Sequence, residues 1–408
     1  MSAGVVIVGG GQAGLSAAAE LRKRGHEGPI TMVCDEPAPP YQRPPLSKAY
    51  LSGELPADRL WLKPEAFYET ARIDLKLATR AQAIDRSGRS LILSNGERLA
   101  YDHLILAPGG QAKRPPLPGV NLKGVHVLRT LAQADALSDA LKGAKKIAIL
   151  GAGYIGLEVA ASARKRGLEV TVVEAADRPM ARTASPLLGG FFGSVHRGYG
   201  VELMVSTPCL GVVPDTTGSR AAGLELPEGE RIEADLVLLA TGLTPDIALA
   251  EAAGLACEDG ILVDHQARTE DEAIYAIGDV ARFHSPRYGR SIRLESVQNA
   301  IEQGKAAAQA IMGMDVSYDP VPWFWSDQYA LKLQIAGLVD GADQLVRRGD
   351  PEEGRFAIFH LKEGRVVACE AVDSGPEYMA AQRMIERGVT PDPERLRSLD
   401  VAMREFLA

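Results

Sequence analysis

Residues 5–14, VVIVGGGQAG, decide the fold. A β-branched run ends in a GxGxxG loop, and a helical pattern follows over residues 15–24, with Gly25 as its predicted C-cap. A second apolar run at residues 30–33 completes a βαβ unit. In such a unit the first glycine permits a tight turn, the second lets backbone N–H groups approach a pyrophosphate, and the third lets the helix pack on the strand. The stretch therefore predicts a dinucleotide-binding fold.

The same unit occurs a second time in the chain. Residues 146–156, KIAILGAGYIG, repeat the strand and the glycine loop, and a helix over about 157–166 and a strand over 170–173 are predicted to follow. A lone GxGxxG match is often a fortuitous glycine turn, but here each copy follows a buried strand, opens a helix and is followed by a second strand. We therefore predict two Rossmann-like dinucleotide-binding domains on one chain.

An acidic residue follows the second strand of each unit. Glu174 is predicted to accept hydrogen bonds from the two hydroxyls of an adenosine ribose. A carboxylate at this position repels the 2′-phosphate of NADPH, and no arginine follows before Arg178, so NADH is the predicted donor. In the first unit the turn before the strand is longer, and either Asp35 or Glu36 could fill the equivalent role.

A third motif is YAIGD at residues 275–279. A strand that ends in Gly-Asp places a carboxylate at the carboxyl edge of a sheet, where ligands bind in open α/β folds. Alone, this motif would be an ordinary turn. Beside two dinucleotide-binding units it predicts that Asp279 bonds a ribityl hydroxyl of FAD and that Gly278 permits close approach.

The order of these units predicts an α/β protein with a split first domain. The Pro- and Gly-rich residues 108–119 and the turn after residue 240 are interpreted as the two chain crossings. We assign residues 1–115 and 244–320 to an FAD-binding domain, residues 116–243 to an NAD-binding domain, and residues 321–408 to a smaller C-terminal α+β domain.

Composition excludes several other classes of protein. A formal net charge of −8 argues against non-specific nucleic-acid binding, and no apolar run reaches the ~18 residues that span a bilayer. The chain runs from Met1 directly into an apolar strand without a signal peptide, so a cytoplasmic location is expected. Zinc-ligand and redox-pair spacings are absent, and no metal site is predicted, because the four cysteines lie far apart at Cys34, Cys209, Cys257 and Cys369.

Together these motifs resemble the two-dinucleotide-binding-domain flavoproteins of the glutathione-reductase-like superfamily. The resemblance spans nearly the whole chain and includes the Ala-Thr-Gly turn at residues 240–242. One departure is Ala107-Pro108-Gly109, where the family's first crossing usually reads Ala-Thr-Gly. Proline lacks the hydroxyl and the backbone donor of threonine, so a minor contact is lost there.

The route by which electrons leave distinguishes the branches of this superfamily. Disulfide reductases need a CxxxxC pair, and the peroxide, CoA-disulfide and water-forming oxidase branches need one reactive cysteine after the second strand. Here that loop is PYQRPPLSK at residues 40–48, without cysteine, and Cys34 just before it is predicted to be a buried, inert thiol. Reduced flavin must therefore pass its electrons directly to a partner.

Four separate motifs resemble the NADH-dependent ferredoxin reductases, which serve [2Fe–2S] ferredoxins of bacterial cytochrome monooxygenases and aromatic-ring dioxygenases. The resemblance implies that hydride passes from NADH to FAD and that electrons then pass one at a time to a [2Fe–2S] ferredoxin. The motifs are RPPLSK at residues 43–48, YIGLE at 154–158, RLESVQNA at 293–300 and WFWSDQ at 323–328.

The resemblance also assigns roles to single residues. Lys48 lies near the reactive edge of the isoalloxazine and pairs with Glu158, which meets the nicotinamide amide, and Trp325 lies beside the flavin. The other FAD contacts are Arg43, Arg129 and the backbones of Ala13, Ala81 and Val297. With the motifs above, the candidate cofactor-binding residues are Gly9, Gly11, Gly14, Asp35, Glu36, Gly278 and Asp279 for FAD, and Gly151, Gly153, Tyr154, Ile155, Gly156, Glu174 and Gly242 for NAD(H).

Two other functions fit the same sequence. One is a rubredoxin or monodehydroascorbate-type reductase, which also lacks thiols. The other is a redox-responsive binding protein that resembles apoptosis-inducing factor. Among the surface residues, Arg287, Arg290 and Arg293 form either a basic rim for an acidic ferredoxin or an ordinary solvated loop.

Overall fold

The structure is a computed structural model that describes residues 4–407. The chain divides into two compact units. Unit 1 comprises Met1–Gln42, Ala57–Gln111 and Thr244–Pro320, and unit 2 comprises Arg43–Pro56, Ala112–Leu243 and Val321–Ala408.

Unit 1 is built on a parallel sheet of five strands in the order β19-β7-β1-β2-β3. All four residues of β1 are buried, as expected for a central parallel strand covered on both faces. The strands are β19 (Ile274–Ala276), β7 (His103–Leu106), β1 (Val5–Val8), β2 (Ile30–Val33) and β3 (Ile73–Lys76).

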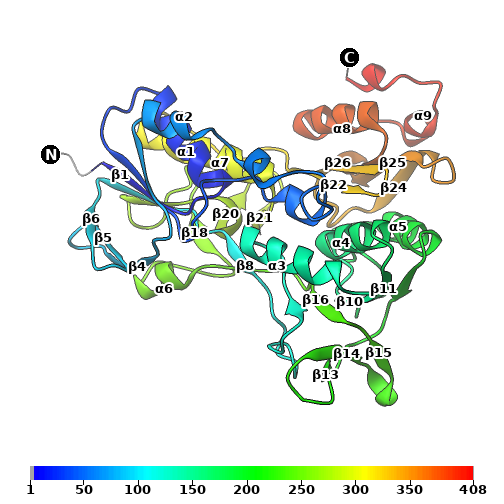
Figure 1. The fold of residues 1–408 in the computed structure, drawn as a ribbon. Coiled ribbons are helices and arrows are strands. Elements are labelled where there is room, and N and C mark those ends of the chain that lie inside the picture. The colour runs from blue at the N-terminus through cyan, green and yellow to red at the C-terminus, as the bar shows by residue number, and fades with distance from the viewer. Residues whose placement is uncertain (1–3, 408) are drawn as a thin grey trace. The chain divides into compact units, whose positions relative to one another are not determined.

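Helices and two small sheets complete unit 1. Helices α1 and α7 lie side by side (Figure 1), and they cross closely because Gly304 of α7 has no side chain: a Cβ there would lie 2.6 Å from the carbonyl oxygen of Ala13. The helices are α1 (Gln12–Lys23), α2 (Glu65–Thr70), α6 (Ala248–Ala252) and α7 (Val297–Ile311). The small sheets are β4 (Ala81–Asp85), β5 (Ser90–Leu93) and β6 (Arg98–Ala100), and β18 (Ile261–Val263), β20 (Ala281–Ser285) and β21 (Arg290–Arg293).

Unit 2 repeats the parallel sheet, in the order β12-β11-β10-β16-β9. Its strands are β12 (Val201–Met204), β11 (Glu169–Val173), β10 (Lys146–Leu150), β16 (Leu236–Leu239) and β9 (Val125–His126), with helices α3 (Leu131–Lys142), α4 (Tyr154–Lys165) and α5 (Pro186–Gly198). An antiparallel sheet of β13 (Gly211–Pro214), β14 (Ala221–Glu225) and β15 (Arg231–Glu233) is attached to it. The two parallel sheets confirm the predicted α/β fold with two Rossmann-like domains.

The C-terminal part of unit 2 is an antiparallel sheet covered by a helix. The strand order is β22-β23-β26-β25-β24, and α8 lies against the sheet (Figure 1) through Tyr378, Ala381 and Met384. The elements are β22 (Trp323–Gln328), β23 (Leu331–Gly337), β24 (Gln344–Asp350), β25 (Arg355–Lys362), β26 (Arg365–Val372), α8 (Gly375–Arg387) and α9 (Pro393–Arg397).

Two details differ from the sequence-based expectations. Helices α1 and α4 begin three residues earlier than the predicted starts at 15 and 157, because the third glycine of each loop lies inside the first helical turn. Residues 43–56, predicted as part of the FAD-binding domain, pack with unit 2 instead.

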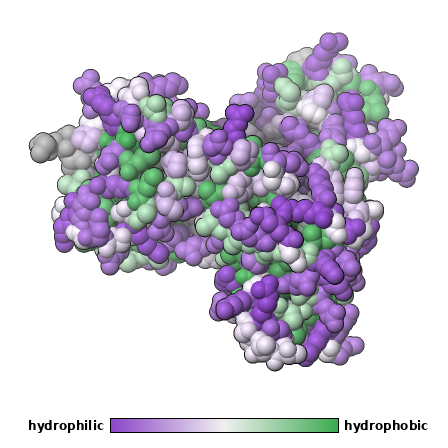
Figure 2. All heavy atoms as spheres, viewed as in Figure 1, coloured by the Kyte–Doolittle hydropathy of each residue, from purple (hydrophilic) through white to green (hydrophobic). Residues whose placement is uncertain are grey.

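One face of the molecule and the character of its helices can be described directly. Figure 2 shows a mostly hydrophilic face on which apolar side chains are dispersed in small patches. Within residues 4–407, no helix combines the length and apolar character needed to cross a bilayer.

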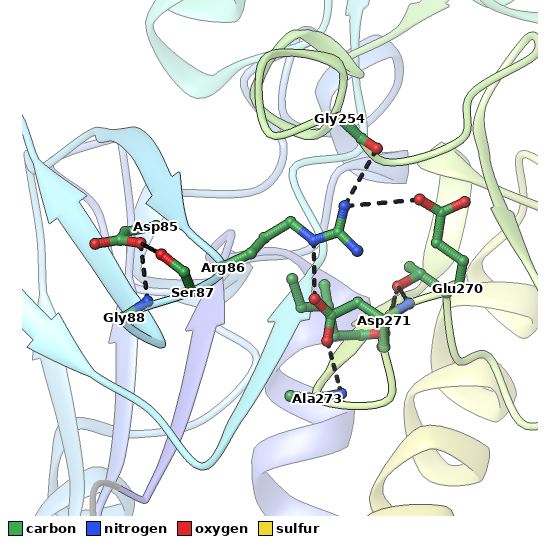
Figure 3. A network of polar contacts seen from close by, with 10 residues as sticks. Asp85, Arg86, Ser87, Gly88, Gly254, Glu270, Asp271 and Ala273 are labelled. Carbon is green, nitrogen blue, oxygen red and sulfur yellow. Dashed lines mark hydrogen bonds and ion pairs between the residues drawn. The ribbon is translucent and has the colours of Figure 1, made fainter.

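Arg86 joins two parts of unit 1 that are far apart in sequence (Figure 3). Its Nε donates to Oδ2 of Asp271 at 2.8 Å, and its Nη1 donates to the carbonyl oxygen of Gly254 at 3.3 Å and lies 3.7 Å from Oε1 of Glu270. Arg86 follows β4, whereas its partners belong to the returning segment 244–320, so this side chain adds polar contacts between the β4–β6 sheet and that segment.

We expect Arg86→Ala to lower the stability of unit 1 by about 1 kcal/mol, because three contacts of one guanidinium are lost. For a unit of this size the melting temperature should fall by about 2–4 °C in a thermal scan. The matched control is Lys142→Ala, which removes an exposed pair with Asp139 and should change the melting temperature by less. Equal effects of the two substitutions would contradict the role of Arg86.

Candidate functional site

The glycine loop of unit 1 has the geometry that a pyrophosphate needs. Gly9 has a φ of +116°, and a Cβ on Gly14 would lie 2.3 Å from the carbonyl oxygen of Gly9, so neither position accepts a side chain. A Cβ on Gly11, in contrast, would meet no protein atom within 4 Å. The middle glycine therefore borders open space at the N-terminus of α1, where free backbone N–H groups and the helix dipole favour an anion.

The Gly-Asp motif lies against the same helix. Gly278 has a φ of +77°, and a Cβ there would lie 3.0 Å from Cβ of Ala13 and 4.0 Å from Cβ of Ala300 in α7. Asp279 follows β19 directly after this contact and is half-buried. The structure thus brings together Gly9, Gly11, Ala13, Gly14, Gly278 and Asp279, with Val297 at the start of α7.

Gln303 was not predicted from the sequence and belongs to the same neighbourhood. Its Oε1 accepts the backbone N–H of Gly278 at 2.8 Å, and its side chain is fully buried. Its Nε2 is a buried donor without an acceptor among residues 4–407. A dinucleotide, with its many oxygen atoms, supplies acceptors of the kind that this donor lacks. No spacing rule marks a glutamine in the middle of α7.

The acidic position after β2 differs from its counterpart in unit 2. By strand register, Cys34 occupies the place that Glu174 holds after β11. A Cβ on Gly10 would lie 2.7 Å from Sγ of Cys34, so the thiol fills this place. Asp35 is exposed, and Glu36 is half-buried and accepts a hydrogen bond from the Tyr41 hydroxyl at 2.5 Å.

Ala81 lies on a segment that runs beside the end of β2. The backbone N–H groups of Ala78 and Thr79 donate to the carbonyl oxygens of Glu36 and Cys34 at 3.1 and 2.9 Å. This pairing leads directly into β4, where Ala81 is half-buried. The contact of Ala81 with FAD stays a prediction.

The glycine loop of unit 2 repeats the geometry of the first. A Cβ on Gly156 would lie 2.2 Å from the carbonyl oxygen of Gly151, whereas a Cβ on Gly153 would meet nothing within 4 Å. Ile155, in the first turn of α4, is 44% exposed. An apolar side chain exposed at the N-terminus of this helix is available to a ligand.

Glu174 is held rigidly beside this loop. Its Oε2 accepts the backbone N–H of Ala152 and its Oε1 accepts that of Ala176, both at 2.8 Å. Each oxygen keeps a further lone pair that a ribose hydroxyl can use. Arg178 is bound to Asp177 at 2.8 Å and to the carbonyl oxygen of Ala181 at 3.3 Å.

The two chain crossings differ by one hydroxyl. Thr241 donates its hydroxyl to the carbonyl oxygen of Lys113 at 2.9 Å, a bond that Pro108 cannot make at the equivalent place in unit 1. The following Gly242 has a φ of +109°, and a Cβ there would lie 3.4 Å from Nη2 of Arg182, which is exposed. The contact of Gly242 with NAD(H) stays a prediction.

A buried carboxylate is the centre of the second group of candidate residues. Glu158, on α4, is only 5% exposed, and its Oε1 lies 2.8 Å from Nζ of Lys48 and accepts the Ser326 hydroxyl at 2.6 Å. Its Oε2 accepts the Ser47 hydroxyl at 2.5 Å. The structure therefore shows the predicted Lys48–Glu158 pair and adds two serine donors that sequence reasoning missed. Both serines lie inside the RPPLSK and WFWSDQ motifs.

Loop 43–56 is fixed to unit 2 by further bonds. The Ser162 hydroxyl donates to the carbonyl oxygen of Ser47 at 2.9 Å, and Nη1 of Arg43 donates to that of Arg129 at 2.7 Å. Arg43 thus contacts Arg129, which lies just before α3. Both residues are assigned to FAD by resemblance. Their contacts with FAD stay predictions.

Strand β22 presents two different faces. Phe324 contacts the ring of Tyr154, with centroids 4.5 Å apart, and Ser326 bonds Glu158, so this face meets α4. Because side chains alternate along a strand, Trp323 and Trp325 lie on the other face, with ring centroids 5.8 Å apart. Trp325 is half-buried, and its place beside the flavin stays a prediction.

Arg293 does not contribute free positive charge to a basic rim. Its side chain is nearly buried and lies 3.3 Å from Asp259 and 2.7 Å from Glu295. Arg287 is also engaged, by the backbone and side chain of Asp319. The alternative of a basic rim is therefore wrong for Arg293, because both neighbouring carboxylates neutralise it.

All four thiols are in environments that favour the protonated form. Burial raises the pKa of Cys34 to about 12, and it raises those of Cys209 and Cys257 and, most strongly, that of Cys369. None of the four forms a disulfide. The predicted burial of Cys34 is confirmed, and its inertness stays a prediction.

A family model described as pyridine nucleotide-disulphide oxidoreductase matches residues 3–304, and one described as reductase C-terminal matches residues 323–407. This chain belongs to the pyridine nucleotide-disulphide oxidoreductase family. Rhodocoxin reductase of Rhodococcus erythropolis is 43% identical over 404 residues, which is 99% of this chain and 94% of that protein.

Two solved structures of this family superpose closely on the chain. Putidaredoxin reductase in its covalent complex with putidaredoxin has a TM-score of 0.96 at 37% identity, covering 99% of this chain and 98% of that one. The ferredoxin reductase for the CYP199A2 system of Rhodopseudomonas palustris also has a TM-score of 0.96, at 39% identity and with 100% of both chains covered.

Members of this family use FAD and NAD(H). The residues present fit both groups: each glycine loop leaves space at its middle glycine, Gln303 offers a buried donor in unit 1, and Glu174 offers a fixed acceptor in unit 2. We assign the unit 1 loop to FAD and the unit 2 loop to NAD(H) as predictions.

Glu174→Ala should weaken the preference for NADH over NADPH, because the ribose acceptor and the charge that repels a 2′-phosphate are both lost. We expect the ratio of kcat/KM for the two donors to fall by about tenfold, which corresponds to one lost charged hydrogen bond. Steady-state rates with each donor measure this ratio. Glu202→Gln, which neutralises a carboxylate on the adjacent strand β12, is the control and should leave the ratio unchanged. An unchanged ratio in Glu174→Ala would remove Glu174 from the donor site.

Cys34 should resist alkylation in the folded protein. A pKa of about 12, against 9.0 for an ordinary thiol, lowers the thiolate fraction at pH 8 by about a thousandfold. Mass spectrometry of peptides after timed exposure to iodoacetamide measures the rate, with a urea-unfolded sample as the control. Labelling of native Cys34 as fast as in urea would contradict the inert assignment.

Proposed function

We propose that this chain is a cytoplasmic NADH-dependent reductase that supplies a [2Fe–2S] ferredoxin serving a monooxygenase or a ring-hydroxylating dioxygenase. The observation that carries the proposal is the presence of two dinucleotide-binding loops on a chain without a reactive thiol. One loop suits the electron donor and the other suits the flavin that receives the electrons.

Because the thiols are predicted to be unreactive, electrons would pass directly from the flavin to a partner and not through a disulfide. A disulfide step needs a thiolate nucleophile, and burial raises the pKa of all four cysteines above the ordinary value. Bound FAD would supply hydride acceptance from NADH and release of the two electrons one at a time, which suits an iron–sulfur acceptor. The chain therefore fits a reductase that delivers electrons to a protein partner.

The relatives support this class of acceptor. Rhodocoxin reductase, putidaredoxin reductase and the Rhodopseudomonas palustris ferredoxin reductase are similar to this chain over nearly its whole length. One of them, putidaredoxin reductase, has been crystallised in a covalent complex with putidaredoxin. A shared fold that includes the C-terminal domain supports a partner of the same chemical kind.

The chain's own residues supply binding and alignment. Glu174 would hold the adenosine ribose of NADH, and the α4 N-terminus would hold its pyrophosphate. Glu158 would bind the nicotinamide amide and hold Lys48 in place through their 2.8 Å contact. Alignment of this kind lowers the barrier because the reacting groups are already oriented.

The test is an anaerobic NADH titration of the FAD-loaded protein, followed by mixing with a purified [2Fe–2S] ferredoxin. We expect the flavin absorbance near 450 nm to bleach and the ferredoxin then to become reduced. Rubredoxin and monodehydroascorbate are the matched alternative acceptors. Faster reduction of either than of every ferredoxin tried would contradict the proposed partner, and an unbleached flavin would contradict the donor.

The same experiment separates the enzyme from a redox-responsive binding protein. In that case NADH oxidation would be slow with every acceptor, and reduction would change the oligomeric state measured by gel filtration. Fast turnover with ferredoxin and no change in elution volume is the result that the proposal predicts.

A further inference from the structure

A chain of hydrogen bonds leads from Glu158 into the interior of unit 2. The Ser326 hydroxyl bonds Glu158 at 2.6 Å, and Nε2 of Gln328 donates to Oγ of Ser326 at 3.2 Å. Oε1 of Gln328 lies 2.9 Å from Nε2 of His196, and Nδ1 of His196 lies 3.3 Å from the Tyr329 hydroxyl. We call these five side chains the polar chain.

The polar chain is buried along most of its length. Ser326, Gln328 and His196 are fully buried, and Glu158 is nearly so. The two β22 residues are two positions apart, so both side chains lie on the strand face that meets α4 and α5. A buried polar group without a partner is costly, so each link of the chain constrains the next one.

The positions of the donors give the polar chain one direction. The Gln328 amide donates to Ser326 through Nε2, so its Oε1 accepts a hydrogen bond from Nε2–H of His196. His196 then carries its hydrogen on Nε2, and its Nδ1 accepts the Tyr329 hydroxyl. Burial lowers the pKa of His196, which keeps the ring neutral at pH 7. Ser326, which accepts from Gln328, has its single hydrogen left for Glu158.

The opposite tautomer of His196 would reverse every link. With the hydrogen on Nδ1, Nε2 would become an acceptor, and the Gln328 amide would turn to donate to it. Oε1 of Gln328 would then accept a hydrogen bond from the Ser326 hydroxyl. Glu158 would lose one of its three side-chain donors and face a lone pair of Ser326 instead. The tautomer of His196 therefore determines whether Glu158, three hydrogen bonds away, receives a hydrogen bond from Ser326.

We propose that His196 is a positioning residue for Glu158, acting through Gln328 and Ser326 to fix the donor that this carboxylate receives and thereby its alignment toward NADH. The proposal rests on the proposed function, in which Glu158 binds the nicotinamide amide. Three segments that are distant in sequence, α5, β22 and α4, thus act together on one carboxylate.

The test is a double-mutant cycle on NADH binding during anaerobic flavin reduction in the FAD-loaded protein. Ser326→Ala removes the donor directly, and His196→Leu removes the group that directs it. We expect each to raise the apparent dissociation constant for NADH about fivefold, with the limiting reduction rate changed less than twofold, as for the loss of one hydrogen bond of ordinary strength. The double variant should equal Ser326→Ala, because His196 acts only through that hydroxyl.

Conservative and control variants sharpen the test. His196→Gln offers an amide N–H to Gln328 in place of Nε2–H and should restore NADH affinity to within about twofold of the original chain. Gln328→Met breaks the polar chain between His196 and Ser326 and should raise the apparent dissociation constant for NADH as much as His196→Leu does. It replaces His196→Leu in the test if that variant folds poorly. Tyr199→Phe keeps the ring stack with Tyr329, at 3.7 Å between centroids, and should have no effect.

A second readout does not depend on flavin reduction. Long-range ¹H–¹⁵N spectra of protein labelled at the histidine ring nitrogens report the tautomer, and the signal lost in His196→Gln identifies His196. We expect a neutral ring with its hydrogen on Nε2 at pH 7.

Several outcomes would overturn the proposal. A hydrogen on Nδ1 would reverse the polar chain. Additive effects, about 25-fold in the double variant, would show that His196 does not act through Ser326, and a lower melting temperature with unchanged NADH affinity in His196→Leu would show a purely structural role. If NADH does not reduce the unsubstituted protein, the proposed function fails. If NADH reduces it and His196→Leu binds NADH with the same affinity, only this inference is refuted.

Discussion

The buried carboxylate of Glu158 joins three segments of unit 2, and the candidate site depends on it. Removing a charge from water is costly, and here the cost is offset by an ammonium and two hydroxyls within 2.8 Å. These donors come from loop 43–56 and from strand β22, whereas Glu158 itself lies on α4. One charge therefore requires three separate segments to be in place. Loss of any donor would leave a buried carboxylate short of a partner, which is why we place it at the centre of the site.

The two dinucleotide-binding loops are copies whose differences have chemical meaning. Both keep a first glycine with positive φ and a third glycine packed on the first, because these are requirements of the backbone itself. They differ after the second strand, where Glu174 stands in one copy and Cys34 in the other. A carboxylate fixed by two backbone N–H groups suits a ribose, whereas a buried thiol fills space. The two loops therefore share their backbone geometry and differ in the side chain that follows the second strand.

Local patterns predicted much of the fold, and non-local contacts account for the rest. The strands at residues 5–8, 30–33 and 146–150 followed from β-branched runs bounded by glycine, since the signal and its cause lie within a few residues. The helix starts were predicted three residues late because Gly14 and Gly156 were interpreted as loop residues. Loop 43–56 groups with unit 2 and not with residues 1–42, because its position depends on bonds to Glu158 and Ser162, more than 100 residues away.

The candidate site, like the fold, was predicted only in part. The Lys48–Glu158 pair came from a resemblance between motifs, and the structure shows it. Ser326, Gln328 and His196 were not predicted, because their contacts depend on which face of β22 meets α5, and no spacing in the sequence determines this. Gln303 was not predicted for a similar reason, since the residue that it bonds, Gly278, is 25 residues away along the chain.

The most direct test of the whole account is the flavin content of the purified protein. Release of the cofactor by denaturation, followed by its identification and quantitation from absorbance and chromatography, gives the moles of FAD per chain. The account predicts one FAD per chain, bound in the purified protein or after incubation with FAD. A colourless protein that takes up no FAD when offered it would contradict the account.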